Sequence, residues 1–255
     1  MKYKSKLKKA AITVAALLFW IVVWFLASLK IDSVFILPSP ALVFPRLFAL
    51  ACTGEFYKVI LISFVRITLG FIIGMVLGFF LGFLTHYIRP AKALFSPLMS
   101  IIRATPVASF ILVIIFWIER EGVPSFISIL MVLPIVWQNT ELGLEKKDKG
   151  LEEVAKVYRL GKWKTLIRVD LPQIVPFVFS AGKTALGLAW KAGVAAEVLA
   201  LPKMSIGMMI YNSKLYLEIV DLYAWTIAII IFSVILEKLF SVIFCAVERR
   251  KHGND

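Results

Sequence analysis

Long apolar runs alternate with short polar segments along the chain, and this pattern predicts membrane-spanning helices. A span needs about 20 consecutive, mostly apolar residues. Six segments meet this requirement: residues 10–29, 59–84, 93–118, 123–142, 172–199 and 222–247. The sequence therefore predicts an all-α polytopic membrane protein with one transmembrane domain over residues 1–255. A polar loop, 143–171, separates the fourth span from the fifth.

The overall composition supports lipid as the solvent for most of this chain. Hydrophobic residues make up 60% of it and charged residues 18%. Soluble domains contain about 45–50% apolar and about 25% charged residues. The composition therefore excludes a soluble enzyme, a disordered chain and a disulfide scaffold.

The first apolar run follows five lysines, which is also the arrangement of a secretory signal peptide. The run is longer than the apolar part of such a peptide, and it carries Trp20 and Trp24. No small-residue cleavage site follows it. We interpret residues 10–29 as a retained first helix.

Basic residues are distributed unequally between the two sides of the predicted topology. With the N-terminus inside, the inner segments hold 18 Lys and Arg and the outer segments hold 6. Positive charge collects on the cytoplasmic side of membrane proteins. We therefore expect a multi-pass protein of the cytoplasmic (inner) membrane with both termini in the cytoplasm. The net charge of +13 then reflects these loops and contact with membrane lipid, and indicates no nucleic-acid partner.

The second span contains a glycine at every fourth position, which places them on one helix face. The four are Gly70, Gly74, Gly78 and Gly82. Such a stripe lets two helix backbones approach closely. It predicts tight packing within one subunit or, alternatively, against a second copy of the chain.

The third span is interrupted by Pro97 and Pro106 and carries Arg103 between them. Proline removes a helical hydrogen bond and kinks the helix. A charged side chain near the bilayer centre costs about 2.5–3.5 kcal/mol on insertion scales. Arg103 therefore either has a structural partner or contributes, with Pro106, to a substrate pathway.

Four polar or amphipathic side chains interrupt the fifth span. Lys183, Trp190 and Glu197 are seven residues apart and share one predicted helix face, with Lys191 about a quarter turn away. Ionisable residues in spans usually face the bundle interior or a wet cavity. We favour a cavity-facing stripe over structural ion pairs. Because interior cations outnumber anions, this predicts a pathway for a small anionic solute.

The polar loop predicts two short amphipathic helices. Glu152 and Glu153 stand at the acidic start of the first, and Gly161 marks a break after it. The second contains Trp163 on its apolar side, and Pro172 suits the first turn of the next span. This hairpin either lies on the lipid surface or fits a groove on a soluble partner.

Several motifs together resemble the permease subunits of binding-protein-dependent ABC importers, in the nitrate/sulfonate/taurine-type branch. Glu153-Val154-Ala155 and the closing Val169-Asp170-Leu171-Pro172 resemble the EAA loop of that family. The branch patterns are similar to Leu37-Pro38-Ser39-Pro40, Arg66 with Gly70-Phe71, Pro97 with Arg103 and Pro106, Ala189-Trp190 and Ala196-Glu197. The loop departs from the family at Arg159, where its glycine would fall; the glycine here is Gly161.

The resemblance implies a homodimer that works with two further kinds of subunit. A cytoplasmic ATPase dimer would dock on the 152–168 hairpin, and an extracytoplasmic binding protein would deliver substrate. ATP and magnesium would bind the ATPase, so this chain would need no cofactor and would not be an enzyme. It has no G-x-x-x-x-G-K-[ST] phosphate loop.

Two other classes of function compete with this interpretation. An ion-gradient-driven secondary transporter could use Lys183, Lys191 and Glu197 for proton coupling. However, six spans without detectable inversion are few for that class, and it leaves the hairpin without a role. An integral membrane enzyme ranks last, because the sequence shows no catalytic constellation and no metal-ligand spacing.

Overall fold

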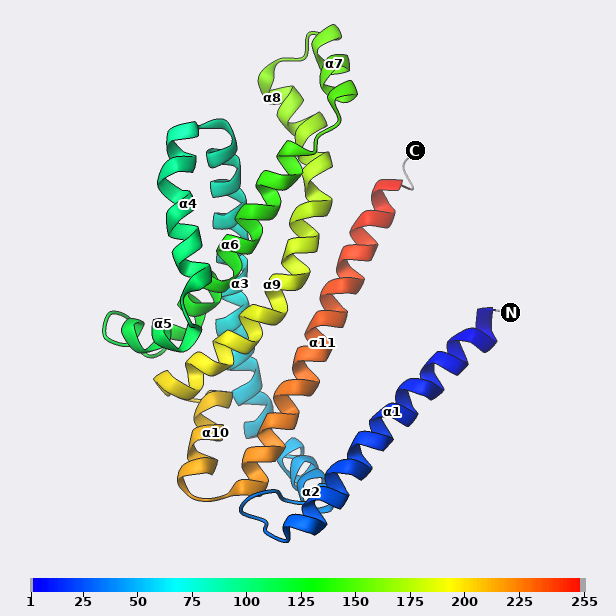
Figure 1. The fold of residues 1–255 in the computed structure, drawn as a ribbon, viewed down its shortest axis with the longest axis vertical. Coiled ribbons are helices and arrows are strands. Elements are labelled where there is room, and N and C mark those ends of the chain that lie inside the picture. The colour runs from blue at the N-terminus through cyan, green and yellow to red at the C-terminus, as the bar shows by residue number, and fades with distance from the viewer. Residues whose placement is uncertain (1, 253–255) are drawn as a thin grey trace. The chain divides into compact units, whose positions relative to one another are not determined.

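Every secondary-structure element between residues 2 and 252 of the computed structural model is a helix (Figure 1). The structure describes these residues, except for the side chains of 2–10, 149, 152, 156, 162 and 243–252. The elements are α1 Lys2–Ile31, α2 Pro40–Ala51, α3 Gly54–Tyr87, α4 Arg89–Ala104, α5 Val107–Ile114, α6 Val123–Glu145, α7 Lys149–Val157, α8 Lys162–Thr165, the π-helix η1 Leu166–Asp170, α9 Leu171–Ala200, α10 Ile206–Leu215 and α11 Ile219–His252. The predicted all-α class is confirmed.

Four described helices are long and apolar enough to cross a membrane. They contain the spans Ala11–Ile31, Gly54–Tyr87, Val123–Glu145 and Ile219–Val242. A fifth is present if α4 and α5 count together as one broken span. The 30-residue α9 is not among them, and it carries Lys183, Lys191 and Glu197. The count of six spans therefore stays a prediction.

The third predicted span, 93–118, is interrupted as expected, but at only one of its two prolines. Helices α4 and α5 meet at a bend of 104°. The break lies at Thr105, whose extended backbone (φ −79°, ψ 131°) is the conformation that a following proline favours. Pro97, in contrast, lies inside an uninterrupted α4. Of the two prolines, Pro106 therefore marks the break.

Two helices lie in segments that the hydropathy pattern assigns to outer loops. Helix α2 begins after Ser39 with a proline in its first turn, and α10 begins after Ser205. The Ser205 hydroxyl accepts a hydrogen bond from the N–H of Met208 at 3.0 Å, which caps α10. Both are too short to span a membrane, so a search for 20-residue runs misses them.

The chain divides into two compact units, of which the first comprises Met1–Val59 and Met209–Ile230. Within it, the indole of Trp24 donates a hydrogen bond to the carbonyl of Pro38 at 3.0 Å. Arg46 and Asp221 form an ion pair at 2.6 Å. An indole hydrogen bond and an ion pair therefore join separate segments of this unit.

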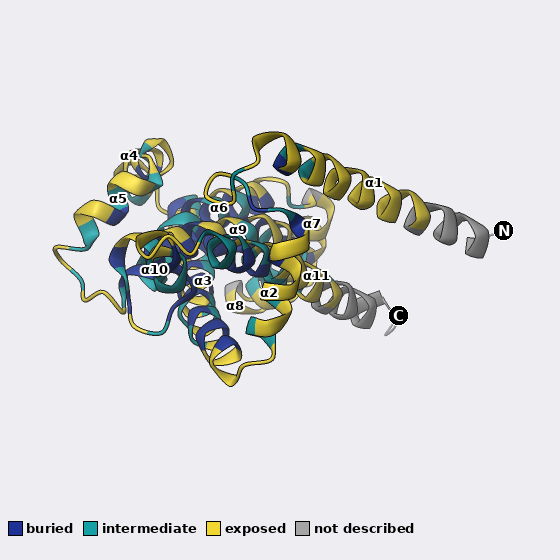
Figure 2. Cartoon of the chain, turned by 90° about the horizontal axis from the view of Figure 1, so that it is seen from below, coloured by how far each residue is buried: buried dark blue, intermediate teal, exposed yellow. Residues whose placement is uncertain are grey.

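The second unit, Ile60–Met208 and Ile231–Asp255, has its core around α6 and α9. One cluster includes Phe71 of α3, Val136 of α6 and Ala185 of α9, and a second joins α5 to α6 and α9. Figure 2 shows dark, buried turns on α6 and α9, whereas the described part of α1 is almost entirely exposed. Helices α6 and α9 therefore form the centre on which the other helices of this unit pack.

The glycine stripe of α3 packs against α6 of the same chain. A methyl group added at Gly74 would lie 2.8 Å from the Cβ of Val132, and one at Gly78 would lie 2.8 Å from the carbonyl oxygen of Leu133. Gly70 and Gly82 meet α6 as closely. The stripe therefore serves packing within the subunit, the first of its two predicted roles.

We expect alanine at Gly74 or Gly78 to destabilise the protein, because each added methyl group would overlap α6. Overpacking of this kind costs about 1–3 kcal/mol. The apparent melting temperature in detergent should fall for both variants. Gly54→Ala is the matched control on the same helix, since its methyl group would meet no atom within 4 Å. An equal melting temperature for all three variants would contradict the close approach of α3 and α6.

Candidate functional site

The predicted hairpin is present as α7, α8 and η1, which extend beyond α6 and α9 (Figure 1). Asp148 begins it, because its side chain accepts a hydrogen bond from the N–H of Gly150 at 2.8 Å. The backbone N–H of Asp148 in turn donates to Gln173 of α9 at 2.8 Å. The start of the hairpin is thus fixed to the helix that follows it.

The sharp turn of the hairpin lies at Arg159, and not at Gly161. Arg159 has a φ of 50°, in the left-handed region. The N–H of Leu160 bonds the carbonyl of Ala155 at 2.9 Å, which is the long bond of a Schellman motif. No described glycine has a positive φ. The predicted break at Gly161 lies within the non-helical segment 158–161 between α7 and α8, but its left-handed residue is Arg159, where the family pattern has glycine.

A buried ion pair fixes the base of the hairpin. The ammonium group of Lys147 lies 3.0 Å from Asp170, and both side chains are about nine-tenths buried. Tyr87 of α3 donates a hydrogen bond to the same carboxylate at 3.3 Å. A second charged group lies nearby, where Glu141 of α6 accepts from Thr85 at 2.7 Å and pairs with Lys92 at 3.3 Å. Sequence reasoning missed these pairs, since their members lie far apart in the chain.

Large apolar side chains are exposed on the hairpin. Val157, Tyr158 and Trp163 are 80%, 76% and 73% exposed. Ala155 is buried, Glu153 is exposed, and the side chain of Glu152 lies outside the described residues. Pro172 is the second residue of α9. The hairpin therefore presents an uncovered apolar surface on an anchored base.

Glu197 lies near the C-terminal end of α9, opposite the hairpin. Its side chain is fully buried, and Oε2 accepts hydrogen bonds from the hydroxyl of Ser63 at 2.9 Å and the N–H of Gly207 at 3.2 Å. The same hydroxyl accepts from the N–H of Ile206 at 3.0 Å. The carboxylate thus lies at the N-terminus of α10, where the helix dipole favours negative charge.

The predicted cavity-facing stripe of α9 is wrong for two of its three members. Trp190 is 2% exposed and Glu197 is 0% exposed, so both are packed against neighbouring helices, and neither lines an open recess with Lys183. Lys183 is exposed instead. A repeat of seven drifts by about 20° around a straight helix, and burial depends on the neighbouring helices, which the repeat does not specify.

Lys183 and Lys191 line an open groove of about 440 Å³ between α9 and α11. Glu237 of α11 lines it as well, with Thr184, Gly187 and Leu188. Two predicted pathway residues therefore share one recess, but their neighbour is Glu237 and not Trp190. The sequence offers a signal for Glu237: it is an acidic residue inside an apolar run.

The two pathway residues predicted in the third span, Arg103 and Pro106, lie on another part of the same unit. Arg103 at the end of α4 donates a hydrogen bond to the side chain of Gln138 on α6 at 2.7 Å. Pro106 is the N-cap of α5. This contact supplies the structural partner that Arg103 requires, and neither residue lines the groove of Lys183 and Lys191.

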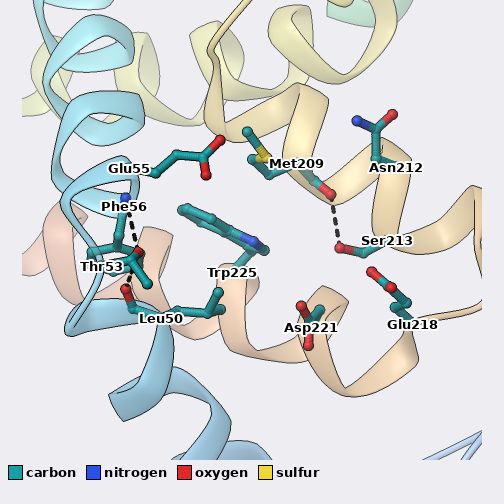
Figure 3. A pocket seen from close by; sticks show the side chains of 10 residues that line it. All are labelled: Leu50, Thr53, Glu55, Phe56, Met209, Asn212, Ser213, Glu218, Asp221 and Trp225. Atoms are coloured by element: carbon teal, nitrogen blue, oxygen red, sulfur yellow. Dashed lines mark hydrogen bonds between the residues drawn. The ribbon is translucent and has the colours of Figure 1, made fainter.

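A smaller recess of about 150 Å³ lies in the first unit (Figure 3). Glu55, Glu218 and Asp221 line it beside the indole of Trp225. Side-chain hydrogen bonds to Asp221 raise the pKa of Arg46. Among the described residues, no group of three His, Cys, Asp or Glu side chains is arranged to hold a metal ion.

Comparison of the sequence with known protein families identifies the family of this chain. Residues 70–253 match the family described as binding-protein-dependent transport system inner membrane component. The chain belongs to this family of transport permeases. The predicted resemblance is thereby confirmed, and the family is one of membrane transport subunits.

Several transport permeases are similar to this chain in sequence, and a solved transporter is similar to it in fold. This permease is 33% identical over 200 residues to the putative aliphatic sulfonates transport permease protein SsuC of Escherichia coli, covering 78% of this chain and 76% of that one. It is 27% identical over 161 residues to the bicarbonate transport system permease protein CmpB of Synechococcus elongatus, covering 63% and 58%. A solved amino acid ABC transporter shares the fold, with a TM-score of 0.56 at 18% identity, covering 89% of this chain and 98% of that one.

Glu197→Ala should destabilise the permease, because it leaves the Ser63 hydroxyl and the Gly207 N–H without their buried acceptor. Loss of such bonds costs about 1–3 kcal/mol. The apparent melting temperature should fall, and hydrogen exchange should accelerate at the start of α10. Glu119→Ala, at an exposed carboxylate, is the control. Unchanged exchange in α10 would show that Glu197 does not hold that helix.

Arg159→Gly should stabilise the hairpin, since glycine adopts the left-handed conformation without strain. A non-glycine residue there costs about 1–2 kcal/mol. Amide hydrogen exchange in α7 should slow relative to the natural chain. Gly161→Ala should change it little, because its methyl group would meet no atom within 4 Å. Faster exchange in Arg159→Gly would contradict this assignment of the turn.

Proposed function

We propose that this permease is the transmembrane subunit of an ATP-driven importer and docks on its ATPase through the α7–η1 hairpin. The observation that carries the proposal is the exposed apolar surface of Val157, Tyr158 and Trp163. An apolar helical surface of this kind is typical of a protein-binding site. The buried Lys147–Asp170 pair would transmit force from that surface into α3, α6 and α9.

The complete transporter would contain further subunits. Two copies of the permease would form the pathway, and an extracytoplasmic binding protein would deliver the substrate. The ATPase would bind ATP and magnesium, so the permease would need no cofactor of its own. The excess of Lys and Arg in the segments that include the hairpin supports a cytoplasmic hairpin and cytoplasmic termini in the inner membrane.

The substrate would be a small anion. Lys183 and Lys191 both line the groove of α9, whereas its described walls carry one carboxylate, Glu237. Ionisable side chains in membrane helices mark substrate and ion pathways. The names of relatives support this class, because they describe permeases for sulfonates, bicarbonate and nitrate.

Trp163→Ser tests the docking surface. Truncation of an exposed aromatic anchor should weaken the ATPase interaction by about tenfold or more. Co-purification with the ATPase subunit and ATP-driven uptake in proteoliposomes should fall together. Folding should be unaffected, since Trp163 is 73% exposed.

Trp117→Ser is the matched control for this test. Trp117 is 83% exposed but lies in the segment between α5 and α6, away from the hairpin. It should leave ATPase binding unchanged. Equal ATPase binding by both variants would exclude the hairpin surface around Trp163 as the docking site.

A further inference from the structure

In the groove between α9 and α11, the side chain of Glu237 lies close to the backbone at Gly187. A methyl group added to Gly187 would lie 2.8 Å from Oε1 of Glu237. The carboxylate of α11 therefore lies directly against the backbone of α9. It does so midway between Lys183 and Lys191, each of which is four residues, or about 6 Å of helix rise, from Gly187.

The charges in this groove do not balance. Two ammonium groups share it with one carboxylate. No side-chain hydrogen bond, and no ion pair within 4 Å, joins the side chain of Lys183, Lys191 or Glu237 to another residue that the structure describes. Lysine side chains are long and flexible, so both can turn toward Glu237 from opposite ends of the groove. One carboxylate neutralises one of them and leaves an excess of one positive charge.

If α9 crosses the membrane, as the predicted fifth span 172–199 requires, an excess charge on it requires a counter-charge, since uncompensated ions are costly in a low-dielectric environment. We propose that Glu237 sets the charge of this groove, so that it accepts an anion with one negative charge in preference to an anion with two. This inference rests on the proposed function, because it assumes that the groove belongs to the pathway. It makes Glu237 a specificity-determining residue.

The test compares three small probes of related shape: methanesulfonate with one negative charge, sulfate with two and dimethyl sulfone with none. The permease–ATPase complex is placed in lipid nanodiscs without the binding protein, which would impose its own selectivity. Apparent affinities are taken from the rise in melting temperature at constant ionic strength. The natural complex should bind methanesulfonate more tightly than sulfate and should not respond to dimethyl sulfone.

Glu237→Gln removes the carboxylate charge and keeps the shape of the side chain, so the net charge of the groove rises from +1 to +2. The ratio of the two affinities should then shift by about tenfold toward sulfate. Lys183→Met should weaken both anions. Glu119→Gln, at an exposed carboxylate outside the groove, should change neither. An unchanged ratio in Glu237→Gln would overturn the proposal, while loss of both anions in Lys183→Met would preserve the anion pathway.

A second variant keeps the proposal testable if Glu237→Gln does not assemble. Lys191→Gln makes the groove neutral, so methanesulfonate should no longer stabilise the complex; persistent stabilisation would overturn the inference. If Glu237→Gln separates the two permease copies, the groove is an interface and the proposal is wrong. Failure of the proposed function would be recognised separately, by ATPase docking that does not depend on Trp163.

Discussion

The close approach of α3 to α6 is the constraint on which the second unit depends. Lipid tails are as apolar as the helix surfaces, so helices in a bilayer associate mainly by close packing and hydrogen bonds. The four glycines of α3 remove the side chains that would separate the two backbones. Helix α6 then packs along α9, and α5 and α11 pack on this centre through the apolar clusters around Ile111 and Phe240. A bulky residue in the stripe would therefore disturb much more than one contact.

Polar contacts hold the two ends of α9, where packing alone would leave charged groups buried. The Lys147–Asp170 pair lies at the hairpin end, and Glu197 lies at the α10 end. Lys147 and Asp170 pair with each other, because an isolated buried charge would cost several kcal/mol, whereas Glu197 accepts hydrogen bonds from Ser63 and Gly207 through Oε2 alone. Both contacts join α9 to α3, through Tyr87 at one end and Ser63 at the other. The helix is thus held at both of its ends to the same neighbour.

The sequence was sufficient to predict features that depend on local pattern. Apolar runs predicted the long helices, the spacing of four predicted the glycine stripe, and the motifs around Glu153 and Pro172 predicted the hairpin and the family.

The sequence was not sufficient where the surroundings of a residue depend on the packing of other helices. The repeat of seven placed Trp190 and Glu197 on the same face as Lys183, yet α3 and α10 cover the carboxylate. The left-handed turn at Arg159 was missed because the glycine two residues later, Gly161, is the stronger compositional signal, although the family's glycine would fall at Arg159. Glu237 stands out in the sequence as an acidic residue inside an apolar run, but its position beside Gly187 depends on the packing of another helix.

Helix α9 connects the three functional features of the second unit. The hairpin precedes it, the groove of Lys183 and Lys191 lies along its middle, and Glu197 lies near its end. Its only interior proline is Pro176, which removes the hydrogen bond to the carbonyl of Pro172 and is the natural place for it to bend. Beyond that point the helix has 24 residues, or about 36 Å, without a helix-breaking proline. A displacement of the hairpin would therefore either bend α9 at Pro176 or move the rest of α9 as one unit. In the second case the groove and the end of α9 around Glu197 would move together. The buried pair at Asp170 lies before this bend, and it ties the end of the hairpin to α3 through Tyr87 and to Lys147 in the segment between α6 and α7. Movement of the hairpin would consequently reach the groove from two sides, through α9 and through the α3–α6 pair that packs against it.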